Sequence, residues 1–372
     1  MIYLDSAATS LLRPDSVQYA VTNAMLTMAS PGRGGHEAAM RAAALCLDCR
    51  ENLARLFNVS EPDDVVFTFN ATHSLNIAIG SLICPGATVL ISGYEHNSVT
   101  RPLKAIGARV ITVETPLFEP DKFVAAFERA LYMCDAAIFT HVSNVFGYIL
   151  PVSRLSRLCR QAGKPFIIDA SQSAGCLEID QQALGADFIA MPGHKGLMGG
   201  QGTGVLLCRG SAKPLIYGGS GSESRSPDMP EFLPDRLEAG THNVPGIAGL
   251  NAGVKYILRL TPAEIRRRER RLLDIFAGEL HDAGGIRMYY SPDLELQAGV
   301  LSIVPESITP EELGGELSEH GVAVRTGLHC APCAHKTVGT LDTGTVRLSF
   351  SPFNTDEEVV SAARLIRKII KT

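Results

Sequence analysis

The stretch PFIIDASQSAGCLEIDQQALGADFIAMPGHKG (165–196) carries the clearest structural signal in this chain. It contains two short apolar runs, 165–170 and 187–191, and small or polar residues follow each run directly. Short apolar runs that end in turn-forming residues indicate buried strands. The polar residues behind them are therefore expected at strand ends.

Similar runs extend this pattern in both directions. They are VVFTF (65–69), TVLISG (88–93), RVITVE (109–114), AAIFTHV (136–142) and GVLLCRG (204–210). Helical patterns lie between them; in 151–163, for example, Leu155, Leu158, Cys159 and Ala162 recur at helical spacing. Strands that alternate with helices predict an α/β fold with a mostly parallel sheet covered by helices on both faces. In such sheets, ligands bind beyond the carboxyl ends of the strands.

A second unit begins near residue 262. The segment 261–285 indicates a long helix with Thr261 as its N-cap and glycine at its end. Shorter strands and helices follow: strands at 298–305, 322–326 and 345–350, and helices at 309–321 and 355–371. This order predicts a smaller α+β domain. The Gly-, Ser- and Pro-rich segment 217–245 is predicted to be a long loop, and loops of this length are usually functional or mobile.

Length and composition narrow the class of protein. A chain of 372 residues fits two domains, and 45% hydrophobic with 20% charged residues is an ordinary globular composition. A net charge of -5 without a long basic tract argues against nucleic acid as a partner. The N-terminus MIYLDSAATS shows no secretory pattern, and no apolar run is long enough to span a membrane. We expect a soluble, cytoplasmic protein.

Nine cysteines are scattered along the chain, which is not the pattern of a disulfide framework. Two pairs have CxxC spacing, Cys46/Cys49 and Cys330/Cys333. The first pair lies in a helical pattern and is predicted to be two buried structural thiols. For the second pair, nearby His329 and His335 make a zinc site conceivable, although we expect no metal.

Chemically versatile side chains follow the predicted strands. They are Thr72 and Ser74, His96, Asn144, Asp169 with Gln172, and His194 with Lys195. Asp169 ends an apolar strand, where a carboxylate needs a cationic partner such as a pyridinium N–H. A lysine that is partly desolvated beyond a buried strand has a lowered pKa, which suits Lys195 to Schiff-base chemistry. Hydroxyl groups at a helix start, such as that of Thr72, favour a phosphate.

Singly, each of these residues has an ordinary structural explanation. Thr72 and Ser74 fit a simple N-cap, Asn144 fits a turn before Gly147, and most lysines are solvated. Together they suggest one ligand that is flat, anionic and protonated on its ring and that carries an aldehyde. Pyridoxal phosphate (PLP) has all of these properties.

Motifs spread over residues 4 to about 359 resemble class V aminotransferase-fold PLP enzymes, and within them the cysteine desulfurases. The matching stretches are LDSAATS, NATHSLN, YEHNSV, HVSNVFG, IIDASQSAG, GHKG, RLEAGTHN, RTGLHC and VRLSF-x3-NTDEEV. The resemblance implies aminotransferase fold type I, with a large PLP-binding domain at 15–255 and a small domain made of 1–14 and 256–372. It also implies a homodimer, L-cysteine or a similar small amino acid as substrate, and a sulfur-acceptor protein as partner.

The resemblance also implies residue roles. Lys195 would hold PLP as a Schiff base, Asp169 would pair with the ring nitrogen, Gln172 with the phenolic oxygen, and His96 would stack on the ring. His96 is also a candidate catalytic residue, because an imidazole there can serve as acid or base. Thr72 and His194 would bind the phosphate, and Thr241 would reach the phosphate in the partner subunit. Asn144, Arg347 and Arg325 would bind the substrate.

Cys330 lies in RTGLHC, which is similar to the RxGxxC pattern of group II desulfurases and selenocysteine lyases. In the implied reaction, Lys195 removes the Cα proton of cysteine and the Cys330 thiolate takes the sulfur as a persulfide, which leaves alanine. His329 or Arg325 would assist the thiolate. The alternatives are a selenocysteine lyase, another class V enzyme such as an aminotransferase or Cβ-lyase, and a PLP-free metal or interaction module.

Two positions depart from the family pattern. Pro192 stands where many desulfurases carry a serine two residues before the phosphate-binding histidine, so one phosphate hydroxyl is lost. Cys333 is unusual beside Cys330, and it would either resolve the persulfide or be inert.

Overall fold

A seven-stranded sheet forms the centre of the computed structural model, which describes residues 1–32, 34–293 and 295–371. Its strands are β2 (Val65–Thr68), β3 (Thr88–Ser92), β4 (Arg109–Val113), β5 (Ala136–Thr140), β6 (Phe166–Asp169), β7 (Phe188–Pro192) and β8 (Gly204–Cys208), in the spatial order β2-β8-β7-β6-β5-β3-β4. All seven predicted strands are confirmed. Only β8 runs antiparallel to its neighbours, so the sheet is mostly parallel, as predicted.

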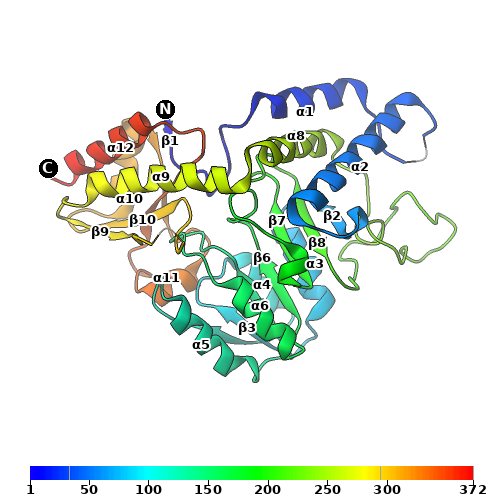
Figure 1. Ribbon diagram of the computed structural model, residues 1–372, viewed down its shortest axis with the longest axis horizontal. Coiled ribbons are helices and arrows are strands. Elements are labelled where there is room, and N and C mark those ends of the chain that lie inside the picture. Colours follow the sequence, from blue (N-terminus) through cyan, green and yellow to red (C-terminus); the bar gives the residue numbers. More distant parts are fainter. Residues whose placement is uncertain (33, 294, 372) are drawn as a thin grey trace.

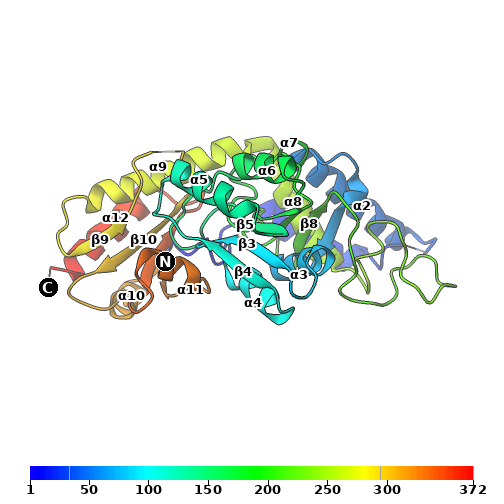
Figure 2. The same cartoon turned by 90° about the horizontal axis from the view of Figure 1, so that it is seen from below.

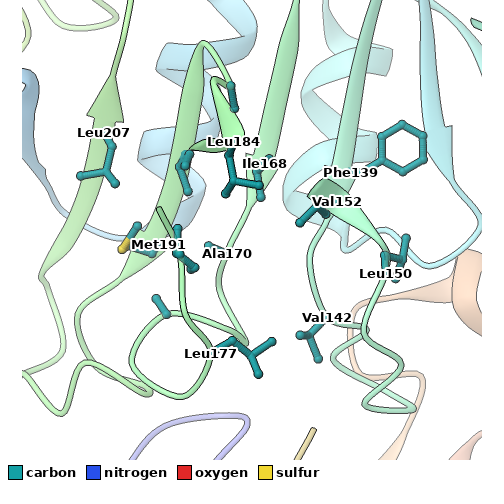
Figure 3. Close-up of a cluster of buried hydrophobic side chains, with 14 of the residues drawn as sticks. Phe139, Val142, Leu150, Val152, Ile168, Ala170, Leu177, Leu184, Met191 and Leu207 are labelled. Carbon is teal, nitrogen blue, oxygen red and sulfur yellow. The ribbon is translucent and has the colours of Figure 1, made fainter. Parts of the chain in front are cut away.

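Helices cover the two faces of this sheet (Figures 1 and 2). One face packs against α2 (Glu37–Phe57), α5 (Pro120–Leu131), α6 (Val152–Gln161), the short α7 (Gln181–Leu184) and α8 (Val244–Leu260). The other face packs against α3 (Ala71–Leu82) and α4 (Asn97–Ala105). Successive strand residues point to opposite faces, so Ile168 joins the first core and Ile167 the second. Figure 3 shows the first core, where Ile168 lies near Ala170 and Leu184.

The C-terminal part forms a second, antiparallel sheet, as predicted for an α+β unit. Its strands are β9 (Ile286–Tyr289), β10 (Val300–Pro305), β12 (Arg325–Gly327) and β13 (Thr345–Ser349), and its helices are α9 (Pro262–Leu280), α10 (Pro310–Glu319) and α12 (Asp356–Ile369). Thr261 caps α9, as predicted, because its side chain accepts a hydrogen bond from the Glu264 N–H. The predicted strand at 322–326 divides into β11 (Val322–Ala323) and β12.

The N-terminal strand β1 (Ile2–Tyr3) pairs with β11, so both ends of the chain lie in the smaller unit (Figure 1). The domain limits at 14 and 255 stay a prediction. The first coincides with the start of α1 (Asp15–Thr27), whereas α8 continues past the second to Leu260. We therefore propose Thr261, between α8 and α9, as the second limit.

Two further predictions concern local structure. Residues 217–243 contain no helix or strand and form the predicted loop, which extends from one end of the molecule (Figure 1). Cys46 and Cys49 lie on α2 and are buried, as predicted. In the described part of the chain, no helix is both long and apolar enough to cross a membrane.

Candidate active site

A cavity of about 210 Å³ lies where the chain leaves β3, β5, β6 and β7. Its lining includes Thr72, His96, Asn144, Asp169, Gln172, His194, Lys195, Arg325, Cys330 and Arg347. All the predicted site residues except Thr241 therefore meet in one place. A larger cavity of about 950 Å³ along α9 contains none of them.

Asp169 is the last residue of β6 and is almost completely buried. Its Oδ1 accepts hydrogen bonds from the backbone N–H (2.9 Å) and the hydroxyl of Ser171. Its Oδ2 has no hydrogen-bond partner among the described residues, although Asp169 lines the cavity. A buried carboxylate with one free oxygen suits a cationic N–H donor, and the ring nitrogen of PLP is such a donor.

Lys195 follows β7 and also lines the cavity. Burial, reinforced by the positive charge of Arg347, lowers its pKa to about 8. Its ammonium forms no ion pair with any described carboxylate, so a substantial fraction of the amine is neutral near pH 8. Gly196 is required here, since a Cβ would lie 2.3 Å from the Ala174 carbonyl oxygen. The Lys195 segment thus packs directly on the chain that follows Asp169.

His96 caps the start of α4 and contacts a pair of hydroxyls. Its Nδ1 accepts a hydrogen bond from the Ser98 N–H (3.0 Å) and lies 2.9 Å from Ser98 Oγ. Ser98 Oγ lies 2.8 Å from Thr72 Oγ1 at the start of α3. Burial lowers the pKa of His96, so the ring is neutral at pH 7.

His194 precedes Lys195, and its Nδ1 lies 3.1 Å from Thr9 Oγ1. Burial and the charge of Lys195 lower its pKa to about 4, so His194 is neutral near pH 7. A neutral imidazole can offer one N–H to a phosphate. Gln172 donates from Nε2 to the Ala7 carbonyl (3.0 Å), and this contact ties the N-terminal segment to the cavity.

Two of the three proposed substrate residues, Arg347 and Asn144, already have protein partners. Arg347 donates to Asp5 Oδ1 (2.7 Å) and to the Asn144 carbonyl (3.1 Å), while its buried Nε has no partner among the described residues. Asn144 Nδ2 donates to the His329 carbonyl (2.8 Å). Arg325 is exposed, faces Arg347 across β12 and β13, and pairs with no described carboxylate. Arg325 is therefore the cation most accessible to a substrate carboxylate.

Cys330 lies on an exposed turn at the cavity, where His329 and Cys330 both have positive φ (51° and 56°). The Asn97 N–H donates to the Cys330 carbonyl (2.8 Å), so the turn is fastened to the start of α4. Burial lowers the pKa of His329 to about 2. A neutral His329 supplies no positive charge, and assistance to the thiolate by His329 or Arg325 stays a prediction.

Cys333 lies in the first turn of α11 (Pro332–Val338) and is half-buried. Burial and the nearby Glu95 carboxylate raise the pKa of its thiol, so it is protonated near pH 7. Within residues 1–32, 34–293 and 295–371, no three His, Cys, Asp or Glu side chains gather as metal ligands. The CxxC spacing at 330–333 therefore lacks the other ligands that a zinc site needs.

Thr241 is exposed and lies apart from the main cavity. It lines a small cavity with Glu238 and Asn243. Glu238 is buried, pairs with Arg50 and accepts a hydrogen bond from the Phe67 N–H (2.6 Å). This pairing holds the chain before Thr241 against β2, and Thr241 is not part of the lining of the main cavity.

Sequence reasoning missed two polar residues, Glu95 and Ser98, that flank His96. Glu95 is fully buried, its carboxylate accepts hydrogen bonds from Ser92 and from the Thr140 N–H, and burial raises its pKa to about 8. Both residues lie in YEHNSV, directly after β3. The strand-end rule that located His96 would have found them, had it been applied to every polar residue of that segment.

Comparison with known proteins adds family membership to this geometry. A family model described as aminotransferase class-V matches residues 2–361. This chain belongs to that family. The family is PLP-dependent, and the residues of the cavity fit PLP through the free oxygen of Asp169 and the low-pKa amine of Lys195.

Relatives and solved structures agree on the branch of the family. The chain is 32% identical to a probable cysteine desulfurase of Methanothermobacter thermautotrophicus, over 99% of this chain and 94% of that protein. It is 33% identical to one of Pyrococcus abyssi, over 100% and 95%. The structure of a cysteine desulfurase from Thermococcus onnurineus NA1 covers the whole chain with a TM-score of 0.91 at 30% identity, and 94% of that structure is matched. The chain therefore groups with the cysteine desulfurases, and its fold is theirs.

Proposed function

We propose that this protein is a PLP-dependent cysteine desulfurase that converts L-cysteine to L-alanine and leaves the sulfur as a persulfide on Cys330. One observation carries the proposal. A cavity at the ends of β3, β5, β6 and β7 brings a low-pKa lysine and a buried carboxylate together with an exposed cysteine. The first two suit the cofactor, and the third suits sulfur transfer.

The residues that would hold PLP surround the inner part of the cavity. Lys195 would bind its aldehyde, Asp169 its ring nitrogen and Gln172 its phenolic oxygen, while His96 would cover the ring. Thr72 and His194 would hold the phosphate, together with the start of α3. Bound PLP would supply an electron sink for the charge that is left when a Cα proton is removed.

The chain's own groups would then carry out the proton and sulfur transfers. The neutral amine of Lys195 would take the Cα proton, and its pKa of about 8 provides enough of that form at neutral pH. Arg325, with Arg347 behind it, would orient the substrate carboxylate. The Cys330 thiolate would attack the substrate sulfur, so that an S–S bond forms as the Cβ–S bond breaks. Protonation of Cβ yields alanine.

Product analysis tests this proposal. The purified holoenzyme, incubated with L-cysteine and a thiol reductant, should release alanine and sulfide in equal amounts. Without the reductant, mass spectrometry should find one added sulfur atom on the peptide that contains Cys330. If cysteine gives no alanine, the desulfurase proposal is wrong. If selenocysteine alone reacts, the protein is a selenocysteine lyase.

We also propose a homodimer. Large apolar side chains are exposed on α1 and α2, among them Tyr19, Met25, Leu26 and Met40. Both helices pack on α8, so these side chains belong to one end of the molecule (Figure 1). Pairing of two copies there would cover them and would let Thr241 approach the partner's phosphate site. We expect Leu26→Asp to shift the mass measured by light scattering from dimer to monomer, whereas the exposed substitution Tyr132→Asp should not. A cytoplasmic location and a sulfur-accepting partner protein stay predictions.

A further inference from the structure

Ser98 occupies a central position that no predicted role explains. Its side chain is 9% exposed, lines the cavity and lies between Thr72 and His96. The distances are 2.8 Å from Ser98 Oγ to Thr72 Oγ1 and 2.9 Å from Ser98 Oγ to His96 Nδ1. The Ser98 backbone N–H also donates to His96 Nδ1, at 3.0 Å. One residue therefore connects the proposed phosphate site to the proposed ring-stacking imidazole.

The direction of these hydrogen bonds follows from the proton count. A backbone N–H can only donate, so His96 Nδ1 carries a lone pair and the ring proton is on Nε2. Ser98 Oγ must then donate to Nδ1. Because a serine hydroxyl has one proton, Ser98 Oγ accepts from the hydroxyl of Thr72. The chain of donation runs from Thr72 through Ser98 to His96.

We propose that Ser98 is a positioning residue, which holds His96 in its Nε2–H form and orients the Thr72 hydroxyl at the proposed phosphate site, where Pro192 offers no donor. The inference rests on the proposed function. Pro192 ends β7 two residues before His194 and carries no donor of its own. Ser98 lies at the start of α4 and lines the same cavity as Pro192 and His194.

This arrangement couples the phosphate site to His96. Thr72 has a single hydroxyl proton, which it gives to Ser98 in this structure. A phosphate oxygen is a stronger acceptor than a serine hydroxyl, so a bound phosphate takes the Thr72 proton. The Ser98 hydroxyl must then donate its proton to Thr72 Oγ1 instead of to His96. His96 Nδ1 keeps only the hydrogen bond from the Ser98 backbone N–H. Occupation of the phosphate site thereby makes His96 more basic.

Other charged groups also act on His96. They are Asp169, which raises its pKa, and Lys195, Arg347 and Arg101, which lower it. Among the described residues, only Ser98 hydrogen-bonds to His96 Nδ1, and a substitution of Ser98 leaves these charges in place. The contribution of the hydroxyl can therefore be measured separately.

The first measurement is the titration of His96 by NMR in the apoenzyme with ¹³C-labelled histidine. Ser98→Ala removes a donor that stabilises the neutral ring, so we expect the pKa of His96 to rise by roughly half a pH unit. Ser98→Thr keeps the hydroxyl and should restore the wild-type value. Thr100→Ala is the matched control, because its hydroxyl bonds Asn97 on the same helix (3.4 Å) and does not line the cavity.

The second measurement is the affinity of the apoenzyme for PLP, followed by absorbance. We expect the Kd to rise about threefold to tenfold in Ser98→Ala and to recover in Ser98→Thr. An unmoved His96 titration in Ser98→Ala overturns the proposal, whatever its PLP affinity. If Ser98→Ala does not fold, Thr72→Val removes the hydroxyl that donates to Ser98 and should raise the His96 pKa by a smaller amount. The absence of any shift in Thr72→Val would then overturn the proposal. A wild-type enzyme that makes no alanine contradicts the proposed function and leaves both measurements valid.

Discussion

Asp169 ends a buried strand and Lys195 follows one, whereas Cys330 lies on an exposed turn. The parallel pairing of β6 with β7 places Asp169 beside Ala190 inside the core, and the same sheet positions Lys195. The Cys330 turn instead contains consecutive residues in the left-handed region, which is costly for side chains other than glycine. It is kept in place by a few hydrogen bonds: Asn97 and Asn144 donate to its carbonyl groups, and its His329 donates to the buried Thr345 hydroxyl.

This difference separates cofactor binding from sulfur transfer. A side chain positioned by a packed sheet tolerates little adjustment. A residue in a turn that is held by single hydrogen bonds can be substituted with little loss of stability in the rest of the fold. We therefore expect substitutions at the strand ends to affect both the cofactor and the reaction, and substitutions in the turn to affect the reaction alone.

The largest effect is expected for Lys195→Ala. It removes both the group that would bind the cofactor aldehyde and the proposed base, so the rate of alanine formation should fall by about 10³-fold or more. The absorbance band of lysine-bound cofactor should also disappear. Lys336→Ala, which removes an exposed lysine paired with Glu114, is the control and should leave both unchanged. A variant at Lys195 that keeps a tenth of the activity would remove this residue from the mechanism.

Cys330→Ala should separate the two regions most clearly. Without the thiolate nucleophile, sulfide release from cysteine should fall by about 10²-fold or more. The PLP content and the thermal unfolding midpoint should stay at wild-type values, because the side chain is exposed. Cys84→Ala removes another exposed thiol and should have no effect on either. Loss of PLP from Cys330→Ala would contradict the proposed separation.

The pH dependence of cofactor uptake tests the strand-end region alone. Only the neutral Lys195 amine attacks an aldehyde, and its pKa is lowered to about 8. The rate constant for reconstitution of the apoenzyme with PLP should therefore rise about tenfold per unit below pH 7 and level off above about pH 8. Cys330→Ala should follow the same curve. A rate that still rises at pH 10 would show an ordinary, solvated lysine.

The smallest effect is expected for Thr345, which hydrogen-bonds the imidazole of His329 in the Cys330 turn. His329 Nε2 lies 3.0 Å from Thr345 Oγ1, whose hydroxyl donates to Ser302. Thr345→Val leaves the buried imidazole N–H of His329 unpaired, so the free energy of unfolding should fall by about 1–3 kcal/mol. We also expect kcat to fall several-fold, while the affinity for PLP stays unchanged. Urea unfolding and steady-state rates measure this. The exposed Thr343→Val is the control. If stability falls while kcat stays unchanged, the hydrogen bond between His329 and Thr345 does not contribute to the activity of the Cys330 turn.

Much of the fold and of the site could be predicted from sequence, and the reason differs by residue. Asp169 and Lys195 were predictable because a strand and the residue after it are neighbours in the chain. Glu95 and Ser98 lie in the same strand-end segment as His96, but their contacts with Thr140 and Thr72, from other segments, are visible only in the structure. The burial of His329, which makes its ring neutral, has no signature in RTGLHC, so its charge state could not be predicted from the sequence.

Short-range patterns in this chain determine the strands, the helix caps and the residues that follow the strands, because these depend on steric preferences and side-chain alternation over a few positions. They also carry the motifs of the family. Tertiary packing decides the rest: the reversed direction of β8, the contacts that link Thr72, Ser98 and His96, and the position of Thr241 in a different cavity from the other site residues. These features join segments that are distant in sequence, and their burial sets each group's pKa and hydrogen-bond partners.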